Sequence, residues 1–393
     1  MEKFAESNVR LNHVSGAGAR SALGSTILSI VLGAIAALSV NTLPVLLTVL
    51  ARTLSLDESQ SGLIAFAEMG GIACGTIGCA LLPRLVAGLT WRWATALGLA
   101  VLIVANLLCT RVADFDLLLS VRGLAGIGSG IVLAVTYASL AARGGARSLA
   151  IFNIMQLGCG WLGMPYLGPI AERYGAAGLF TLFAGIAFAA LLFSPLLPRG
   201  SDDASASTPG GAVSAPGWLA ILSALLYFAG VGAIYAYVAF MGVAWGGAQA
   251  TVDSHVATMM FAGMVGGLVV ALAGSRFGLK GPLCAAYLLL LTTMVLFAVL
   301  KPVDGFLPMI CLFGFAWNIV TPYQFEAITA VDSSSSAAML VNASTLGGLA
   351  LGPAVAASFV TESYLQVNIL AVTGVLASFL LLLGALGMHD RRS

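Results

Sequence analysis

Charged side chains are scarce in this 393-residue sequence: Lys, Arg, Asp and Glu together make up 8% of it, whereas 60% of the residues are hydrophobic. Soluble globular domains carry about 25% charged residues because their surfaces face water. So few charges cannot cover a soluble particle of this size. Most of the outer surface must contact lipid, and the composition predicts an integral membrane protein.

Residues for metal, cofactor or enzyme chemistry are equally sparse. The six cysteines and three histidines form no CxxC or Cys–His cluster, which excludes the usual zinc, iron–sulfur and disulfide frameworks. The sequence has no HExxH motif, no paired aspartates within an apolar run and no nucleotide-binding loop. No basic patch indicates nucleic acid. We expect no metal, no cofactor, no ATP drive within the chain and no enzymatic activity.

Long apolar runs are what the sequence has instead. A membrane-spanning helix needs about 20 mostly apolar residues, and twelve such runs follow one another along the chain. They cover residues 24–50, 60–82, 93–110, 115–140, 148–171, 177–197, 217–243, 252–274, 280–300, 304–328, 335–360 and 364–387. The predicted fold class is an all-α membrane protein with twelve transmembrane helices.

One polar linker, residues 198–216, separates the sixth run from the seventh and is rich in Ser, Gly, Pro and Asp. It divides the chain into two pseudo-symmetric six-helix bundles. The predicted organisation, in chain order, is a cytoplasmic tail over 1–23, a bundle over 24–197, the cytoplasmic linker over 198–216, a second bundle over 217–387 and a cytoplasmic tail over 388–393.

The basic residues predict an orientation. With the N-terminus inside, twelve Lys and Arg residues fall on the cytoplasmic side and four on the outer side, and Arg122 lies within a run. Cytoplasmic loops are enriched in Lys and Arg. Both termini are therefore predicted to be cytoplasmic, in a multi-pass protein of the cell (inner or cytoplasmic) membrane that functions as a monomer.

Three sets of motifs resemble the major facilitator superfamily. The fourth run opens with Arg122-Gly-Leu-Ala-Gly-Ile-Gly, similar to the family's RxxxGxG pattern. Gly-Pro pairs occur in the fifth and eleventh runs, with their prolines 184 residues apart. Basic loops follow the second and eighth runs. In the loop after the second run, Pro83 stands where the family has an acidic residue. The Gly-Pro motif of the fifth run, which the family's exporters carry in full, is incomplete.

The resemblance implies the superfamily fold and secondary transport by alternating access, in which two bundles rock around a midplane site. It also implies that runs 1, 4, 7 and 10 line a central cavity. The residues assigned to its conformational motifs are Arg84, Gly126, Gly168, Pro169, Arg276, Gly352 and Pro353.

Two charges lie well inside apolar runs. A charge at mid-membrane costs about 2.5–3.5 kcal/mol on insertion scales, so such residues are candidates for function. Glu68 in the second run and Arg122 in the fourth lie at similar depth. The resemblance implies that these two helices are near neighbours, so the two charges are predicted to pair. Exchange of that partner would let Glu68 take up a proton, which predicts proton coupling; a static pair that fixes helix packing is the alternative.

Substrate-binding candidates are polar and aromatic residues on the cavity-lining runs and on run 5. Arg122, Ser129 and Thr136 recur every seven residues, so they share a helix face that we expect to line the cavity. The full set is Arg122, Asn41, Gln156, Tyr235, Trp317, Asn318, Tyr323 and Gln324.

The sequence therefore predicts a proton-coupled secondary transporter of a small organic solute, with efflux of amphipathic compounds favoured. Two alternatives stay open. One is proton-coupled uptake of an aromatic or aliphatic carboxylate held by Arg122; the other is a transporter-like membrane sensor without net transport. The predicted partners are a small-molecule substrate, protons and the lipid bilayer.

Overall fold

The computed structural model describes residues 23–81, 90–112, 114–197, 212–274, 276–300, 305–360 and 364–391, and within these ranges it contains helices and no strand. The predicted N-terminal tail, apart from Leu23, and most of the predicted linker lie outside the described residues. The linker was predicted to end at residue 216, but α8 already begins at Ala215. Ser214 caps it by accepting a hydrogen bond from Gly217 N.

The helices are long and apolar, as twelve membrane crossings require. In chain order they are Leu23–Ala36, α2 (Leu38–Asn41), α3 (Leu43–Leu54), α4 (Glu58–Leu81), α6 (Trp91–Cys109), α7 (Phe115–Phe193), the 3-10 turn η1 (Ser194–Leu196), α8 (Ala215–Ala244), α9 (Gln249–Ala273), α10 (Lys280–Leu300), α11 (Phe306–Val331), α12 (Ser335–Ala357) and α13 (Leu365–Asp390).

The helix α7 runs over 79 residues but reverses direction twice. Tyr137 and Phe152 are in edge-to-face contact with ring centroids 5.5 Å apart, so the chain turns back between them. A second reversal coincides with Gly175, whose φ of +67° is readily adopted only by glycine. Beyond it the chain returns along α6, since Leu197 O accepts a hydrogen bond from Arg92 at the start of α6.

These reversals settle the number of crossings. Ten described helical segments are long and apolar enough to span a membrane, and one of them, Arg147–Leu196, contains the Gly175 reversal and crosses twice. The shorter helices Leu23–Ala36 and Leu43–Leu54 follow one another and form one further crossing around α2. The described residues therefore contain twelve crossings.

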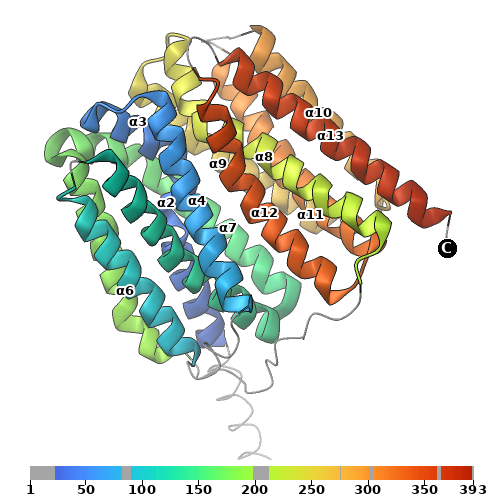
Figure 1. The fold of residues 1–393 in the computed structure, drawn as a ribbon, viewed down its shortest axis with the longest axis horizontal. Helices are drawn as coiled ribbons and strands as arrows, with labels where there is room; N and C mark the ends of the chain where they lie inside the picture. Colours follow the sequence, from blue (N-terminus) through green and yellow to red (C-terminus); the bar gives the residue numbers. More distant parts are fainter. Residues whose placement is uncertain are drawn as a thin grey trace, which may run out of the picture.

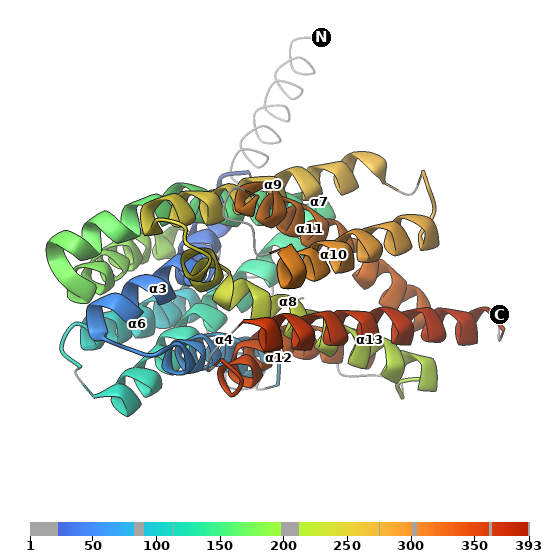
Figure 2. The same cartoon turned by 90° about the horizontal axis from the view of Figure 1, so that it is seen from above.

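The two six-helix halves lie side by side (Figures 1 and 2). They contact each other through α4 against α12, α7 against α9 and α3 against α8. The α3–α8 contact joins the first crossing to its counterpart, the seventh, whereas α4–α12 joins the second to the eleventh and α7–α9 the fifth to the eighth. The last two contacts are equivalent to each other in a chain built from two similar bundles.

The halves converge at one end and diverge at the other. Figure 1 shows α4 and α12 meeting where α4 begins and α12 ends, and separating toward the opposite ends. A Cβ on Gly62 would lie 2.9 Å from Ala357 Cβ, one on Gly70 would lie 3.9 Å from Ala350 Cβ, and one on Gly78 would meet nothing within 4 Å. We name the converging end, which carries residues 55–57, 245–248 and 358–360, the distal end.

Candidate functional site

Glu68 of α4 and Arg122 of α7 form an ion pair inside the N-terminal half. Arg122 Nη2 and Glu68 Oε2 are 2.6 Å apart, and the two side chains are 0% and 1% exposed. The angles between these atoms fall outside hydrogen-bond geometry, and Arg122 Nε has no hydrogen-bond partner among the described residues. The contact is therefore a close ionic one, and the guanidinium group keeps N–H donors, at Nε and Nη2, that form no hydrogen bond among the described residues.

Glycines bring the two charges together. A Cβ on Gly126 would lie 2.1 Å from Glu68 O, and a Cβ on Gly71 would lie 2.1 Å from Gly123 O. Real Cβ atoms do not approach oxygen this closely, so only glycine permits this backbone contact between α4 and α7. In lipid, where packing replaces the hydrophobic effect, such small residues set helix separation. The RxxxGxG pattern thus places its own arginine beside Glu68.

Arg122 has three further neighbours within the same half. Its Nη1 donates a hydrogen bond of 3.2 Å to Asn106 Oδ1 of α6, and its guanidinium lies 5.4 Å from the centre of the Phe180 ring. Cys109 of α6 is also in contact with it. All of these partners come from the N-terminal bundle.

The prediction that one face of the fourth crossing lines a central cavity is wrong for this conformation. Arg122, Ser129 and Thr136 are 0%, 1% and 3% exposed. Thr136 donates a hydrogen bond of 3.5 Å to Ser29 O, on the first crossing. The face they share therefore packs inside the bundle, because the glycines at 126 and 130 draw it against α4.

The first crossing is interrupted at its centre. Pro44 lies in the first turn of α3 and has no N–H, so the carbonyl of Val40, four residues earlier, loses its helical partner. The Tyr235 hydroxyl of α8 donates a hydrogen bond of 2.8 Å to Val40 O. A side chain of the C-terminal half thus satisfies a carbonyl that proline frees in the N-terminal half.

Aromatic rings surround this junction. Tyr235 lies edge-to-face with Trp317 of α11, with ring centroids 5.4 Å apart, and Trp317 contacts Phe313 at 5.9 Å. The Tyr227 hydroxyl donates a hydrogen bond of 3.1 Å to Trp317 O. Glu68 lies within electrostatic range of the Tyr235 hydroxyl.

Two predicted amides remain partly exposed beside the junction. Asn41 packs on Gly160 of α7, and its Nδ2 has no hydrogen-bond partner among the described residues. Gln156 Nε2 donates a hydrogen bond of 3.0 Å to Asn153 Oδ1. Together with Trp317 and Asn318, which are also partly exposed, these side chains are the predicted candidates that are not buried.

Two predicted candidates on α11, Gln324 and Asn318, contact their own bundle, and a third, Tyr323, is buried. Gln324 is 0% exposed, and its Nε2 lies 3.4 Å from Ser223 Oγ. Asn318 Nδ2 donates to Gly314 O and packs against Gly263 of α9. Tyr323 is 4% exposed. The predicted exposure of these three residues to a central cavity is therefore wrong for Gln324 and Tyr323, and Asn318 is engaged by its neighbours.

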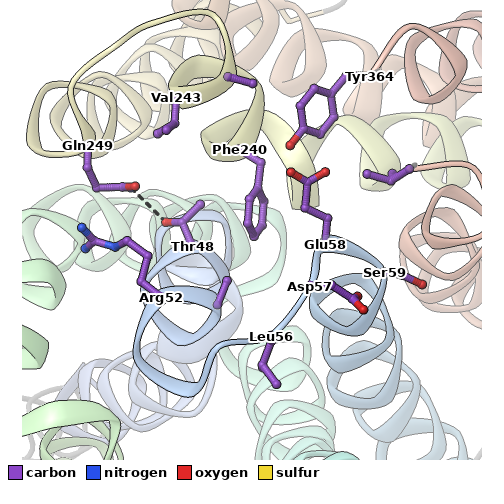
Figure 3. Close-up of a pocket in the computed structure, with 13 residues that line it drawn as sticks. Thr48, Arg52, Leu56, Asp57, Glu58, Ser59, Phe240, Val243, Gln249 and Tyr364 are labelled. Atoms are coloured by element: carbon purple, nitrogen blue, oxygen red, sulfur yellow. Dashed lines mark hydrogen bonds between the residues drawn. The ribbon is translucent and has the colours of Figure 1, made fainter. Parts of the chain in front are cut away.

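A cavity of about 900 Å³ lies between the halves at the distal end. Its lining includes Arg52, Glu58, Phe240, Gln249 and Tyr364 (Figure 3). It lies between the Tyr235–Val40 contact and the distal end. The sequence alone did not indicate this cavity.

Hydrogen bonds join the halves around this cavity. Gln249 Nε2 donates to Thr48 Oγ1 at 3.1 Å and to Asp253 Oδ1 at 2.7 Å. The Tyr237 hydroxyl donates to Glu58 O at 3.1 Å.

Two acids of this region were missed. Neither Asp253 nor Glu58 was among the predicted site residues, because the predicted eighth run begins at 252 and the second at 60. In the structure α9 begins at Gln249 and α4 at Glu58, so Asp253 lies a full turn inside its helix and is 5% exposed. The i, i+4 spacing of Gln249 and Asp253 is the sequence signal that could have indicated this network.

The motif residues fall at contacts and turns. Gly168 of α7 faces Asp253 of α9, with a distance of 3.6 Å from an added Cβ to Oδ2, and precedes Pro169. Gly352, beside Pro353, packs so closely on α8 that a Cβ would lie 2.2 Å from Ala229 O. Arg276 lies in the exposed turn after α9. Arg84 lies outside the described residues.

Comparison with known proteins finds similar solved structures but no matching family model or curated sequence. Among solved structures, a point mutant of the nucleoside transporter NupG is 14% identical, with a TM-score of 0.73 over 93% of this chain and 99% of its own. Unmutated NupG is 14% identical, with a TM-score of 0.68 over 94% and 98%. The predicted fold class, an all-α membrane protein with twelve transmembrane helices, is confirmed, and the chain shares the fold of these two structures.

Proposed function

We propose that this chain is a secondary transporter that works by alternating access, seen here in a conformation closed at the distal end. One observation carries the proposal: the halves are hydrogen-bonded to each other at the distal end and the midplane, and diverge toward the opposite end (Figure 1). In the predicted orientation the distal end is extracellular, so the conformation faces inward. Rocking of the halves around the midplane would expose the site alternately to each side.

Opening of the distal end requires three contacts to break. They are Tyr235 with Val40 O, Tyr237 with Glu58 O, and Gln249 with Thr48. Each joins the first or second crossing to the seventh or eighth. A neutral hydrogen bond contributes about 0.5–1.5 kcal/mol net, so three together bias the equilibrium while leaving it reversible.

The Glu68–Arg122 pair is the proposed proton-responsive element. Arg122 stays charged, and its proximity favours the charged form of Glu68. Movement of α4 against α7 would separate the pair and leave a buried carboxylate, which favours uptake of a proton. Because Glu68 also lies within electrostatic range of Tyr235, this protonation would be sensed at the junction between the halves.

The accessible side chains support an uncharged, partly aromatic solute. Asn41 and Gln156 offer amide groups and Trp317 an aromatic face, whereas Arg122 is fully buried and already paired. A carboxylate substrate held by Arg122 is therefore less well supported. A nucleoside, the substrate named for the structural neighbours, combines a planar base with hydroxyl groups and belongs to the supported class.

Transport is tested with the purified chain in proteoliposomes carrying an imposed pH gradient. The probes are tritiated uridine, radiolabelled benzoate and the amphipathic dye rhodamine 6G. Accumulation against a gradient in either direction supports the proposal, and net export of the dye supports the predicted efflux. Absence of both net flux and counterflow for every probe would contradict transport and favour a sensor.

Proton coupling is tested separately, by comparing two Glu→Gln variants with the parent chain. Glu68→Gln should abolish accumulation driven by the pH gradient while retaining counterflow, since exchange needs no net proton movement. Glu172→Gln, which removes an exposed acid of α7, is the matched control and should behave like the parent chain. Gradient-driven accumulation by Glu68→Gln would exclude Glu68 as the coupling residue.

A further inference from the structure

The distal cavity has two unlike sides separated by an aromatic ring. Figure 3 shows Arg52 on one side, Glu58 and Tyr364 on the other, and Phe240 between them. Its volume of about 900 Å³ lies in the range of cavities that hold drug-sized ligands. The walls come from both halves, since Arg52 and Glu58 belong to the N-terminal half and Phe240 and Tyr364 to the C-terminal half.

The acidic side of the cavity has a carboxylate, that of Glu58, without an ion pair among the described residues. Asp57 is engaged in capping α4: Asp57 Oδ1 accepts from Gln60 N at 2.7 Å, and Asp57 N donates to Gln60 Oε1 at 3.0 Å. Glu58 is held in place through its backbone, which accepts the Tyr237 hydroxyl. Its carboxylate forms no ion pair with any Lys or Arg in the part of the chain that the structure describes.

A buried hydroxyl faces that carboxylate. Tyr364 is only 9% exposed, and Figure 3 shows its hydroxyl pointing toward the Glu58 carboxylate, with which it interacts. A phenol that donates to a carboxylate keeps lone pairs on its own oxygen, and the carboxylate keeps further acceptor sites. A cationic donor placed beside both groups would use these remaining acceptors at once.

Charge and apolar surface together select the kind of donor. With Arg52 opposed by Asp57 and Glu58, the lining carries an excess of negative charge, which favours a cation. Phe240, Val243 and Val360 provide apolar and aromatic surface that a hydrated metal ion would not use. An ammonium group on an apolar body uses both features.

We propose that the distal cavity is a binding site for amphipathic organic amines. The ammonium group lies between the Glu58 carboxylate and the Tyr364 hydroxyl, and the apolar body packs on Phe240 and away from Arg52. The occupied site bridges the two halves where they converge, so the ligand stabilises the conformation closed at the distal end. The site does not depend on the proposed function, because binding here needs no transport.

The test is a fluorescence titration of dansylcadaverine, a primary amine on an apolar fluorophore, against the full chain in phosphatidylcholine nanodiscs. Empty discs provide the baseline for partition into lipid. Saturable binding is expected for the parent chain. The N-acetyl derivative, which has the same body without the charge, should bind roughly tenfold more weakly, because charge-assisted hydrogen bonds contribute about 1.5–3 kcal/mol.

Variants locate the bound amine. Glu58→Gln should weaken binding roughly tenfold, and Tyr364→Phe should weaken it about threefold, since the phenol is a neutral partner. Glu172→Gln, an exposed acid of α7 outside the cavity lining, is the matched charge control and should bind like the parent. Melting curves matching those of the parent show that each variant is folded.

Three results would overturn the proposal. They are equal binding of the amine and its N-acetyl derivative, parent-like binding by both Glu58→Gln and Tyr364→Phe, and an equal loss with Glu172→Gln. Displacement of the probe by Mg²⁺ at millimolar concentration with no effect of monovalent salt would point to a metal site instead. Because no gradient is applied, these outcomes are separate from success or failure of the transport assay.

Discussion

The Tyr235 hydroxyl donates a hydrogen bond of 2.8 Å to the carbonyl oxygen of Val40, across the boundary between the two halves. This carbonyl is available because Pro44, four residues later, cannot donate to it. Pro44 thus interrupts the first crossing and, by freeing the carbonyl of Val40, also provides the acceptor through which the two halves are joined. The bond exists only while the halves are together at the midplane.

Tyr235→Phe should therefore shift the conformational equilibrium toward the state open at the distal end. Loss of one hydrogen bond and exposure of an unpaired carbonyl changes the free-energy difference by about 1 kcal/mol, roughly a fivefold change in population. Hydrogen–deuterium exchange, read by mass spectrometry, should increase in α3 and in the distal half of α8. Tyr166→Phe, at a position 66% exposed, is the matched control. Unchanged exchange in both variants would mean that Tyr235 does not restrain the halves.

The buried ion pair predicts an asymmetric cost of substitution. Arg122→Gln leaves Glu68 buried without its cation and should lower stability by about 3–5 kcal/mol, because the cost of burying the remaining charge is then uncompensated. The double variant Glu68→Gln, Arg122→Gln removes both charges and should be more stable than Arg122→Gln alone. Thermal melting of the four chains in one detergent provides the cycle. Additive losses would show that the two residues do not stabilise each other.

Much of the fold was predictable because membrane crossings leave a strong signal in the sequence. Continuous apolar runs of sufficient length identify helices, and a charge inside such a run, as at Glu68 and Arg122, stands out by its cost. Both residues were predicted from their cost, and their pairing from similar depth together with the helix arrangement that the family resemblance implies.

The rotation of each helix about its axis was not predictable in the same way. A polar stripe does not identify the cavity side, because Arg122, Ser129 and Thr136 share a face that is buried within the bundle, and packing of small residues decides which side turns inward. Arg122 and Gln324 therefore face their own bundles. Asp253 was missed for another reason: a difference of three residues in a helix start, 249 rather than 252, separates a solvated end from a buried turn. Glu58 was missed because α4 begins there, two residues before the predicted run.

Asp332 predicts a pH dependence of stability outside the membrane-spanning segments. It accepts hydrogen bonds from Ser214 N at 2.7 Å, Ser214 Oγ at 2.8 Å and Ser334 N at 3.0 Å, and so ties the start of α8 to the end of α11. Desolvation alone would raise the pKa of its carboxyl group, but these hydrogen bonds outweigh it and lower the pKa to about 2. The ordinary pKa of an aspartate is about 3.9.

The sign follows from this depression of the pKa. The contribution of Asp332 to stability is complete above about pH 4 and is lost as the pH falls toward 2, because the unfolded chain takes up the proton first. Asp332→Asn should lower the melting temperature at pH 7, by an amount equivalent to about 1 kcal/mol after allowing for solvent screening. The gap between variant and parent should narrow between pH 4 and pH 2. Asp116→Asn, an exposed acid, is the control; a gap that stays constant with pH would contradict the role of the carboxylate charge.

The close contact between α4 and α7 predicts opposite effects for two Gly→Ala substitutions. At Gly126 a Cβ would lie 2.1 Å from Glu68 O, so Gly126→Ala must separate the backbones, which also pulls Arg122 away from Glu68. A loss of about 1–3 kcal/mol is expected from such overpacking, together with impaired transport. At Gly78 of α4 a Cβ meets nothing within 4 Å, and alanine is the better helix former, so Gly78→Ala should be neutral or stabilising. Melting temperature and uridine counterflow measured on both variants distinguish packing from a general intolerance of alanine. If both variants behave like the parent, the helices can separate at no cost, and the glycines do not hold Glu68 against Arg122.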